Sequence, residues 1–132
     1  MSQPVNEPIM GYAPGSPERG ALQNEIDRQL AELIEIPCVI NGELVFTGNT
    51  VTQVVPHDHG HVLANVHLAG RAEMDAACEA AVNAREGWIA LGLEGRCEVF
   101  ERCAALLAGD WRKRVNASTM LNQSKTLSLI HI

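Results

Sequence analysis

Apolar and polar positions repeat with a helical period through the second half of the chain. In a first segment the apolar positions recur at i, i+3, i+4, i+7 and i+14, and acidic residues occupy the opposite side. A second segment repeats the pattern. The two apolar stripes consist of Met74, Ala77, Cys78, Ala81 and Trp88, and of Cys97, Phe100, Cys103, Ala104 and Leu107. The pattern predicts two amphipathic helices, each of which must bury its stripe against another surface.

A third helix is expected after these two. Gly109 stands where a helix end favours a residue that tolerates the left-handed conformation. Asp110 is a suitable N-cap for a further helix from Trp111 to about Asn122. We therefore expect residues 71–123 to form a layer of two or three helices.

The first third of the chain predicts an extended arm followed by a helix. Residues 1–15 hold three prolines and two glycines, a composition typical of an arm that needs another surface to lie on. Ser16 as N-cap, Pro17 at the first helical position and Glu18 in the first turn predict a helix start. One face of this helix is marked by Leu22, Ile26, Leu30 and Leu33, so we expect it to end near Leu33.

Short strands are expected between the first helix and the helical layer. Asn41-Gly42 lies between two apolar runs, which predicts a β-hairpin with a type I′ turn. The remaining segments are predicted as a strand at 51–55, a turn at 57–60 and a strand at 61–68. The predicted fold class of this chain is α+β: an arm, a helix, a small antiparallel sheet, then two or three helices.

Composition restricts the function classes. The 132 residues suit one domain, and 46% hydrophobic with 20% charged residues allows a packed core. A net charge of −6 argues against a nucleic-acid-binding surface, and we interpret Arg112-Lys113-Arg114 as a solvated helix face. No apolar run reaches the length of a membrane span, and the first residues resemble neither a signal nor a transit peptide. We expect no membrane partner and a cytoplasmic location, or the mitochondrial matrix in a eukaryotic source.

Three histidines form the first candidate site. His57, His59 and His61 alternate, and an extended strand would place all three on one face, as in some metal sites. Pro56 and Gly60 indicate a turn instead, which does not preserve that geometry. We favour a hydrogen-bonded turn, and a small metal-binding protein remains the alternative.

The cysteines form the second candidate. Cys38, Cys78, Cys97 and Cys103 have no CxxC spacing, and three of them fall on apolar stripes. We therefore interpret them as reduced, buried thiols rather than disulfides or nucleophiles.

Motifs for nucleotide binding and for hydrolytic catalysis are not found. No glycine-rich turn joins a predicted strand to a predicted helix, and residues 123–126 share only the last residue types of a P-loop motif. No Ser-His-Asp arrangement can be argued. The residues alone indicate structure and no active site.

Several motifs occur in an order that resembles the amino-terminal region of one enzyme family. They are Asn6-Glu7-Pro8-Ile9, Gly15-Ser16-Pro17-Glu18-Arg19, Ile36-Pro37-Cys38-Val39-Ile40, Val55-Pro56, His59-Gly60-His61, Ala84-Arg85, Trp88, Arg96, Phe100, Ala104, Leu107, Thr119-Met120 and Gln123-Ser124-Lys125-Thr126. The pattern resembles the delta-1-pyrroline-5-carboxylate dehydrogenases (L-glutamate γ-semialdehyde dehydrogenases) of the aldehyde dehydrogenase superfamily. It runs from about Asn6 to Thr126.

This resemblance implies an α/β parent enzyme that oxidises L-glutamate γ-semialdehyde to L-glutamate with NAD, in proline catabolism. A cysteine attacks the aldehyde, hydride passes to the nicotinamide, and a glutamate-activated water hydrolyses the thioester. The resemblance places these groups and the cofactor domain outside the matched region. We therefore expect no catalytic, cofactor-binding or metal residue on this chain, and a homo-oligomeric parent enzyme.

The last six residues depart from the family pattern. Leu127-Ser128-Leu129-Ile130-His131-Ile132 is what a common transposase adapter encodes in one reading frame. We expect residues 1–15 to be an arm, 16–126 the amino-terminal part of an aldehyde dehydrogenase domain, and 127–132 an artefact. Such a segment would be inactive alone and would leave apolar stripes uncovered. A second alternative is a stand-alone helical interaction module, in which Trp88 and Trp111 would be buried.

Overall fold

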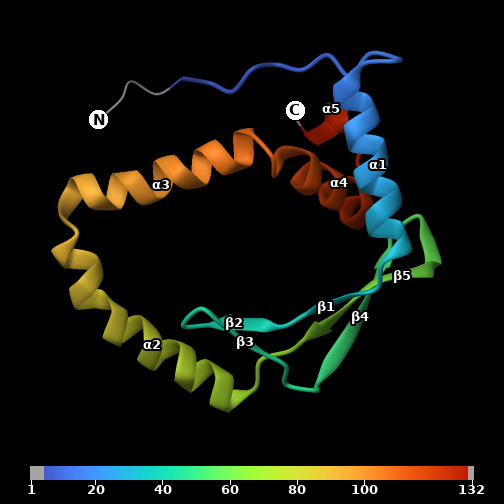
Figure 1. The fold of residues 1–132 in the computed structure, drawn as a ribbon. Helices are drawn as coiled ribbons and strands as arrows, with labels where there is room; N and C mark the ends of the chain where they lie inside the picture. Colours follow the sequence, from blue (N-terminus) through green and yellow to red (C-terminus); the bar gives the residue numbers. More distant parts are fainter. Residues whose placement is uncertain (1–4, 131–132) are drawn as a thin grey trace.

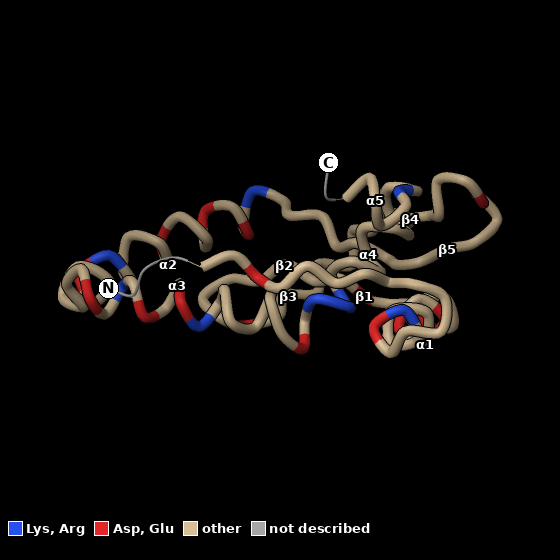
Figure 2. Tube along the Cα trace, turned by 90° about the horizontal axis from the view of Figure 1, so that it is seen from above, with Lys and Arg blue, Asp and Glu red and all other residues tan. Residues whose placement is uncertain are grey.

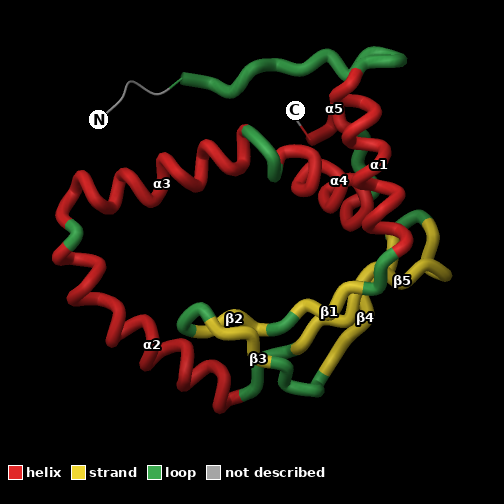
Figure 3. Tube along the Cα trace, viewed as in Figure 1, coloured by secondary structure: helices red, strands yellow, loops and turns green. Residues whose placement is uncertain are grey.

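The chain folds into a helix, five short strands and four further helices within residues 5–130, which the computed structural model describes (Figure 1). In chain order the elements are α1 (Pro17–Ala31), β1 (Ile34–Ile36), β2 (Cys38–Ile40), β3 (Glu43–Val45), β4 (Thr50–Val55), β5 (Asp58–His67), α2 (Arg71–Ala90), α3 (Gly92–Ala108), α4 (Arg112–Gln123) and α5 (Leu127–Ile130). The strands lie together at one side of the molecule, and the helices and an extended amino-terminal segment make up the rest (Figure 3).

The first helix begins as predicted. The Ser16 hydroxyl accepts a hydrogen bond from the Arg19 N–H at 3.3 Å, and Pro17 occupies the first turn. The helix ends at Ala31, earlier than predicted, because the backbone is already extended at Glu32. Leu33 lies beyond the helix and is 57% exposed, so it does not belong to the buried face.

The predicted hairpin is confirmed. Strands β2 and β3 pair antiparallel, with Cys38 opposite Val45 and Ile40 opposite Glu43. Asn41 and Gly42 both have positive φ, at 52° and 79°, as a type I′ turn requires.

The predicted α+β class is confirmed, but the main sheet is mixed rather than antiparallel, which corrects that part of the prediction. Its strand order is β1-β5-β4: β4 pairs antiparallel with β5, and β1 pairs parallel with the other edge of β5. Strand β1 was not predicted, because three residues are too few to show a period. Strand β5 begins at Asp58, three residues earlier than predicted, because the turn between β4 and β5 needs only Pro56 and His57.

The core lies where α1 and α4 pack against this sheet. Val55 and Leu63 of the sheet and Leu121 of α4 form a buried cluster, and Ile26 and Leu30 of α1 pack against it. Burial of these side chains provides the main favourable free energy of the fold.

The three helices predicted after the strands are confirmed as α2, α3 and α4, but their ends differ from the prediction. Gly109 caps α3 with a φ of −101°, outside the left-handed region, so its predicted conformation is wrong. Asp110 does not cap α4: Trp111 takes that position and makes no side-chain cap hydrogen bond. Between α2 and α3 the connection is Leu91 alone, and Gly92, with a φ of 66°, provides the change of direction.

Helices α2 and α3 lie outside the core. The chain runs from β5 into α2, turns at Leu91 into α3 and returns to α4, so that the two helices form a wide loop (Figure 1). In the perpendicular view the described residues form a thin layer, and no other described element lies over either side of this loop (Figure 2). Both helices are described throughout, and none of their residues is buried.

Candidate functional site

The three histidines of the first candidate site contact different parts of the chain. His57 Nδ1 lies 2.7 Å from the Ser124 hydroxyl oxygen at the end of α4, and His61 Nε2 lies 3.0 Å from the carbonyl oxygen of Leu30 in the last turn of α1. His59 is exposed. The first contact joins the β4–β5 turn to the end of α4, and the second joins β5 to the last turn of α1. Within residues 5–130 no three histidine, cysteine or acidic side chains are grouped to hold a metal ion.

The His57–Ser124 contact is a hydroxyl–imidazole pair, which invites comparison with hydrolytic enzymes. Both side chains are exposed, and Ser124 is in the left-handed conformation with a φ of 50°. In the described part of the chain no carboxylate is hydrogen-bonded to His57, so the pair lacks the third group that orients a catalytic base. We interpret it as a structural hydrogen bond.

The cysteines are free thiols, but the prediction that they are buried is wrong. Cys78 and Cys103 are exposed, and Cys38 and Cys97 are half-buried. Cys38 lies beside the sheet, with its Sγ 3.4 Å from the carbonyl oxygen of His67. The two exposed thiols lie on the apolar stripes of α2 and α3, which no other described element covers.

A polar cluster that the sequence analysis missed joins α1 to α4. Arg28 donates to both carboxylate oxygens of Glu25, and Gln29 Nε2 donates to Glu25 Oε1 at 3.0 Å. Gln29 also accepts a hydrogen bond from the Ser118 hydroxyl at 2.9 Å and donates to the Arg114 carbonyl at 3.2 Å. The hydrogen bonds from Arg28 and Gln29 lower the pKa of Glu25 to about 2, and Arg28 is the largest cause.

A signal for this cluster was present in the sequence. Glu25 and Gln29 follow Leu22 at i+3 and i+7, so they share its helix face and are buried with it. Buried polar side chains require partners, and α4 supplies them.

The buried Arg112 of α4 forms a hydrogen bond and an ion pair with the amino-terminal segment. Arg112, predicted to lie on a solvated face, is only 7% exposed. Its Nη1 donates to the Pro8 carbonyl at 2.8 Å, and its Nη2 lies 3.4 Å from the Glu7 carboxylate. The Nε of Arg112 and the Nδ2 of Asn116 find no acceptor among the described residues.

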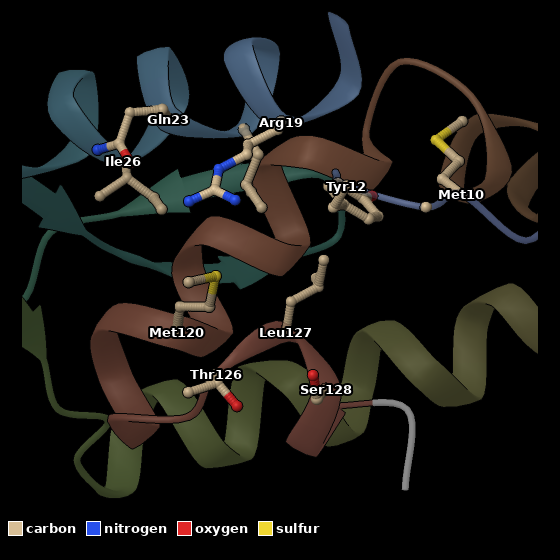
Figure 4. Close-up of a pocket in the computed structure, with 11 residues that line it drawn as sticks. Met10, Tyr12, Arg19, Gln23, Ile26, Met120, Thr126, Leu127 and Ser128 are labelled. Carbon is tan, nitrogen blue, oxygen red and sulfur yellow. The ribbon is translucent and has the colours of Figure 1, made fainter. Parts of the chain in front are cut away.

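A cavity of about 460 Å³ opens between this segment, α1 and the end of α4 (Figure 4). Arg19 reaches into it from α1, and Met120 and Leu127 line the opposite side. Its other polar lining residues are Tyr12, Gln23, Thr126 and Ser128. Among the described residues the cavity offers one cation and several neutral hydrogen-bonding groups, but no carboxylate, histidine or cysteine for acid–base or nucleophilic chemistry.

Helices α2 and α3 expose large apolar side chains. Phe100 is 66% exposed and Met74 57%, although both lie on predicted apolar stripes. Trp88 and Trp111 are 40% and 48% exposed, which does not favour a self-sufficient interaction module. No helix in the described residues is both long enough and apolar enough to cross a bilayer.

Comparison with known proteins assigns the chain to a family. The model of the aldehyde dehydrogenase family matches residues 46–131, more than half of the chain. The chain belongs to the aldehyde dehydrogenase family. Within this family, the mitochondrial delta-1-pyrroline-5-carboxylate dehydrogenase of Rattus norvegicus is 38% identical over 123 residues, which cover 93% of this chain and 22% of the relative.

Solved aldehyde dehydrogenase structures show the same arrangement of elements. The delta-pyrroline-5-carboxylate dehydrogenase of Mycobacterium tuberculosis superposes with a TM-score of 0.91 and 42% identity, covering 96% of this chain and 24% of that chain. A structure of that enzyme bound with NAD gives a TM-score of 0.87 and 41% identity, covering 92% and 23%. The chain therefore spans less than a quarter of the length of these relatives.

Proposed function

We propose that this chain is the amino-terminal segment of an NAD-dependent dehydrogenase that oxidises L-glutamate γ-semialdehyde (delta-1-pyrroline-5-carboxylate) to L-glutamate. The observation that supports it best is the likeness to the Mycobacterium tuberculosis enzyme, at 42% identity over nearly the whole chain. Residues 16–126 would form the first part of the aldehyde dehydrogenase domain, with 5–15 lying across it.

In this proposal the chain contributes structure rather than chemistry. The described residues do not suit NAD, because no glycine-rich turn leads from a strand into a helix and residues 123–126 follow a helix instead of a strand. The catalytic cysteine, the glutamate base and the cofactor site would lie outside this chain. The parent enzyme would be a homo-oligomer of the cytoplasm or the mitochondrial matrix.

The last residues are proposed to derive from an adapter rather than from the enzyme. The family match runs to residue 131 and overlaps them. The coding DNA decides it: codons other than CTG TCT CTT ATA CAC ATC at 127–132 would reject an adapter origin.

The substrate is tested with the enzyme encoded by the complete gene. We expect NADH formation with L-glutamate γ-semialdehyde and far less with an unsubstituted aliphatic aldehyde, while the 132-residue chain forms none with either. Equal rates with both aldehydes would reject the proposed substrate, and NADH formation by the chain alone would reject the proposal that it is an inactive segment.

A further inference from the structure

The side chain of His67, the last residue of β5, makes a contact through each of its ring nitrogens. Its Nδ1 accepts a hydrogen bond from the Gly48 N–H at 3.1 Å, and its Nε2 lies 3.2 Å from a carboxylate oxygen of Glu35 in β1. The other oxygen of this carboxylate accepts a hydrogen bond from Asn65 Nδ2 at 2.6 Å, which fixes its position. The His67 side chain is only 9% exposed, so its ring is held among these partners rather than in solvent.

The two partners determine where the His67 ring carries its proton. A backbone N–H can only donate, so the contact with Gly48 requires an unprotonated Nδ1. A carboxylate accepts, so the proton of the neutral ring belongs on Nε2 and is donated to Glu35. A second proton, taken from solvent, would bind the lone pair of Nδ1 and would face the Gly48 N–H. Two donors would then oppose each other, and this hydrogen bond would be lost.

The surroundings of the ring decide which contact a charged His67 keeps. Glu35 of β1 is the carboxylate that faces it, and attraction between the two charges would hold Nε2 in place. From β2 the thiol of Cys38 meets the main-chain carbonyl of His67 at 3.4 Å, and the ring of Phe46 packs edge to face at 5.2 Å. No other ionisable side chain in the described part of the chain bonds to the ring. The contact with Gly48 is therefore the one that protonation breaks.

The turn that carries Gly48 is otherwise held by groups that do not titrate. Thr47 Oγ1 donates a hydrogen bond to the carbonyl oxygen of Leu68 at 3.0 Å. Thr50 of β4 stands opposite His67 in the sheet and also has no titratable group. The turn therefore stays attached at its neighbours when the Gly48 N–H is released.

We propose that the contact between His67 and Gly48 is an acid-sensitive joint between the main sheet and the turn that follows the β-hairpin. When His67 gains a second proton, it keeps Glu35 and releases the Gly48 N–H. The turn between β3 and β4 then becomes more mobile, while the pairing of β4 with β5 is retained. This regulatory device does not depend on the substrate proposed for the parent enzyme.

The test is nuclear magnetic resonance of the isotopically labelled 132-residue chain between about pH 7.5 and about pH 5.5, within the range in which histidines change charge. At the upper pH the ring nitrogen signals of His67 should show a bare Nδ1 and a protonated Nε2. As these signals report the second proton, the Gly48 amide should lose protection from hydrogen exchange. Taken relative to the rate of an unprotected amide at each pH, the loss should be roughly two- to tenfold, the value of one hydrogen bond.

Three variants separate this joint from a general effect of acid. His67→Asn keeps an acceptor oxygen close to the ring position of Nδ1 but gains no proton, so protection of the Gly48 amide should no longer change with pH. Glu35→Gln removes the charge that favours the charged ring, so the loss should move to lower pH. His59→Asn, the matched control, removes an exposed histidine of the same strand and should leave the response unchanged.

Each of the opposite results overturns the proposal. It fails if Nδ1 of the neutral His67 ring carries the proton, if His67 stays neutral down to about pH 5, or if the Gly48 amide keeps its protection once the ring is charged. It also fails if protection falls equally in His67→Asn, or if Glu35→Gln leaves the pH of the loss unchanged. A parallel loss of protection in α1 and α4 would reject it as well, because acid would then act on the whole fold.

Discussion

Truncating Phe100 should have different consequences in the isolated chain and in a complete enzyme. In the isolated chain the ring is 66% exposed, and its aromatic neighbour is Trp88 at 6.2 Å. Phe100→Ala removes little buried area there and one edge-to-face pair, so we expect a loss of about 1 kcal/mol or less in the free energy of unfolding. A fully covered phenylalanine loses roughly 3–5 kcal/mol on the same change.

The assay is urea unfolding followed by far-ultraviolet circular dichroism. Phe100→Ala is compared in the isolated chain and in a chimera in which residues 5–126 replace the matched region of the Mycobacterium tuberculosis enzyme. Leu121→Ala serves as the control, because Leu121 is 6% exposed within the core and should lose about 2–5 kcal/mol in both contexts. A loss of 3 kcal/mol or more for Phe100→Ala in the isolated chain would refute the reasoning, as would a loss equally small in the chimera.

Three further predictions concern the described contacts. The lowered pKa of Glu25 stabilises the folded chain fully above about pH 4.5, and this stabilisation is lost as the pH falls towards about 2. Between these pH values wild type should therefore lose about 1–2 kcal/mol more of its free energy of unfolding than Glu25→Gln, a figure reduced because Arg28 is half-exposed. Arg112→Met removes the contacts of Arg112 to Pro8 and Glu7, but it also removes one unsatisfied donor. Limited proteolysis should therefore cleave the segment 5–15 several-fold faster, while the free energy of unfolding changes by only about 1 kcal/mol. An unchanged cleavage rate would contradict this prediction. Equilibrium dialysis should find equal background zinc with wild type and with His59→Ala, and a stoichiometric zinc ion lost in the variant would restore the metal-binding alternative.

The sequence predicted correctly those elements of the fold that depend on residues close together in the chain. Asn41-Gly42 specified the hairpin because few residue pairs accept two positive φ angles, and Ser16-Pro17 specified the start of α1 because the cap uses a side chain three residues from its donor. Helices α2 and α3 were predicted because their apolar residues repeat with a helical period over several turns.

Features that depend on distant partners could not be predicted. Strand β1 is only three residues long and forms because it pairs in parallel with the edge of β5. The hydrophobic period of the sequence does not reveal such a distant partner. Arg112 has the sequence context of a solvated face, but the segment around Pro8 folds over it. Cys78 and Cys103 lie on apolar stripes, as burial would require, yet no described element covers them.

Hydrogen–deuterium exchange tests most directly the claim that this chain is part of a larger fold. In the isolated chain we expect slow exchange in α1, α4 and β5 and fast exchange throughout α2 and α3, whose residues are not buried. In the chimera, α2 and α3 should become as protected as α4. Equal, strong protection of all these helices in the isolated chain would contradict the account, since α2 and α3 would then be stable without a covering partner.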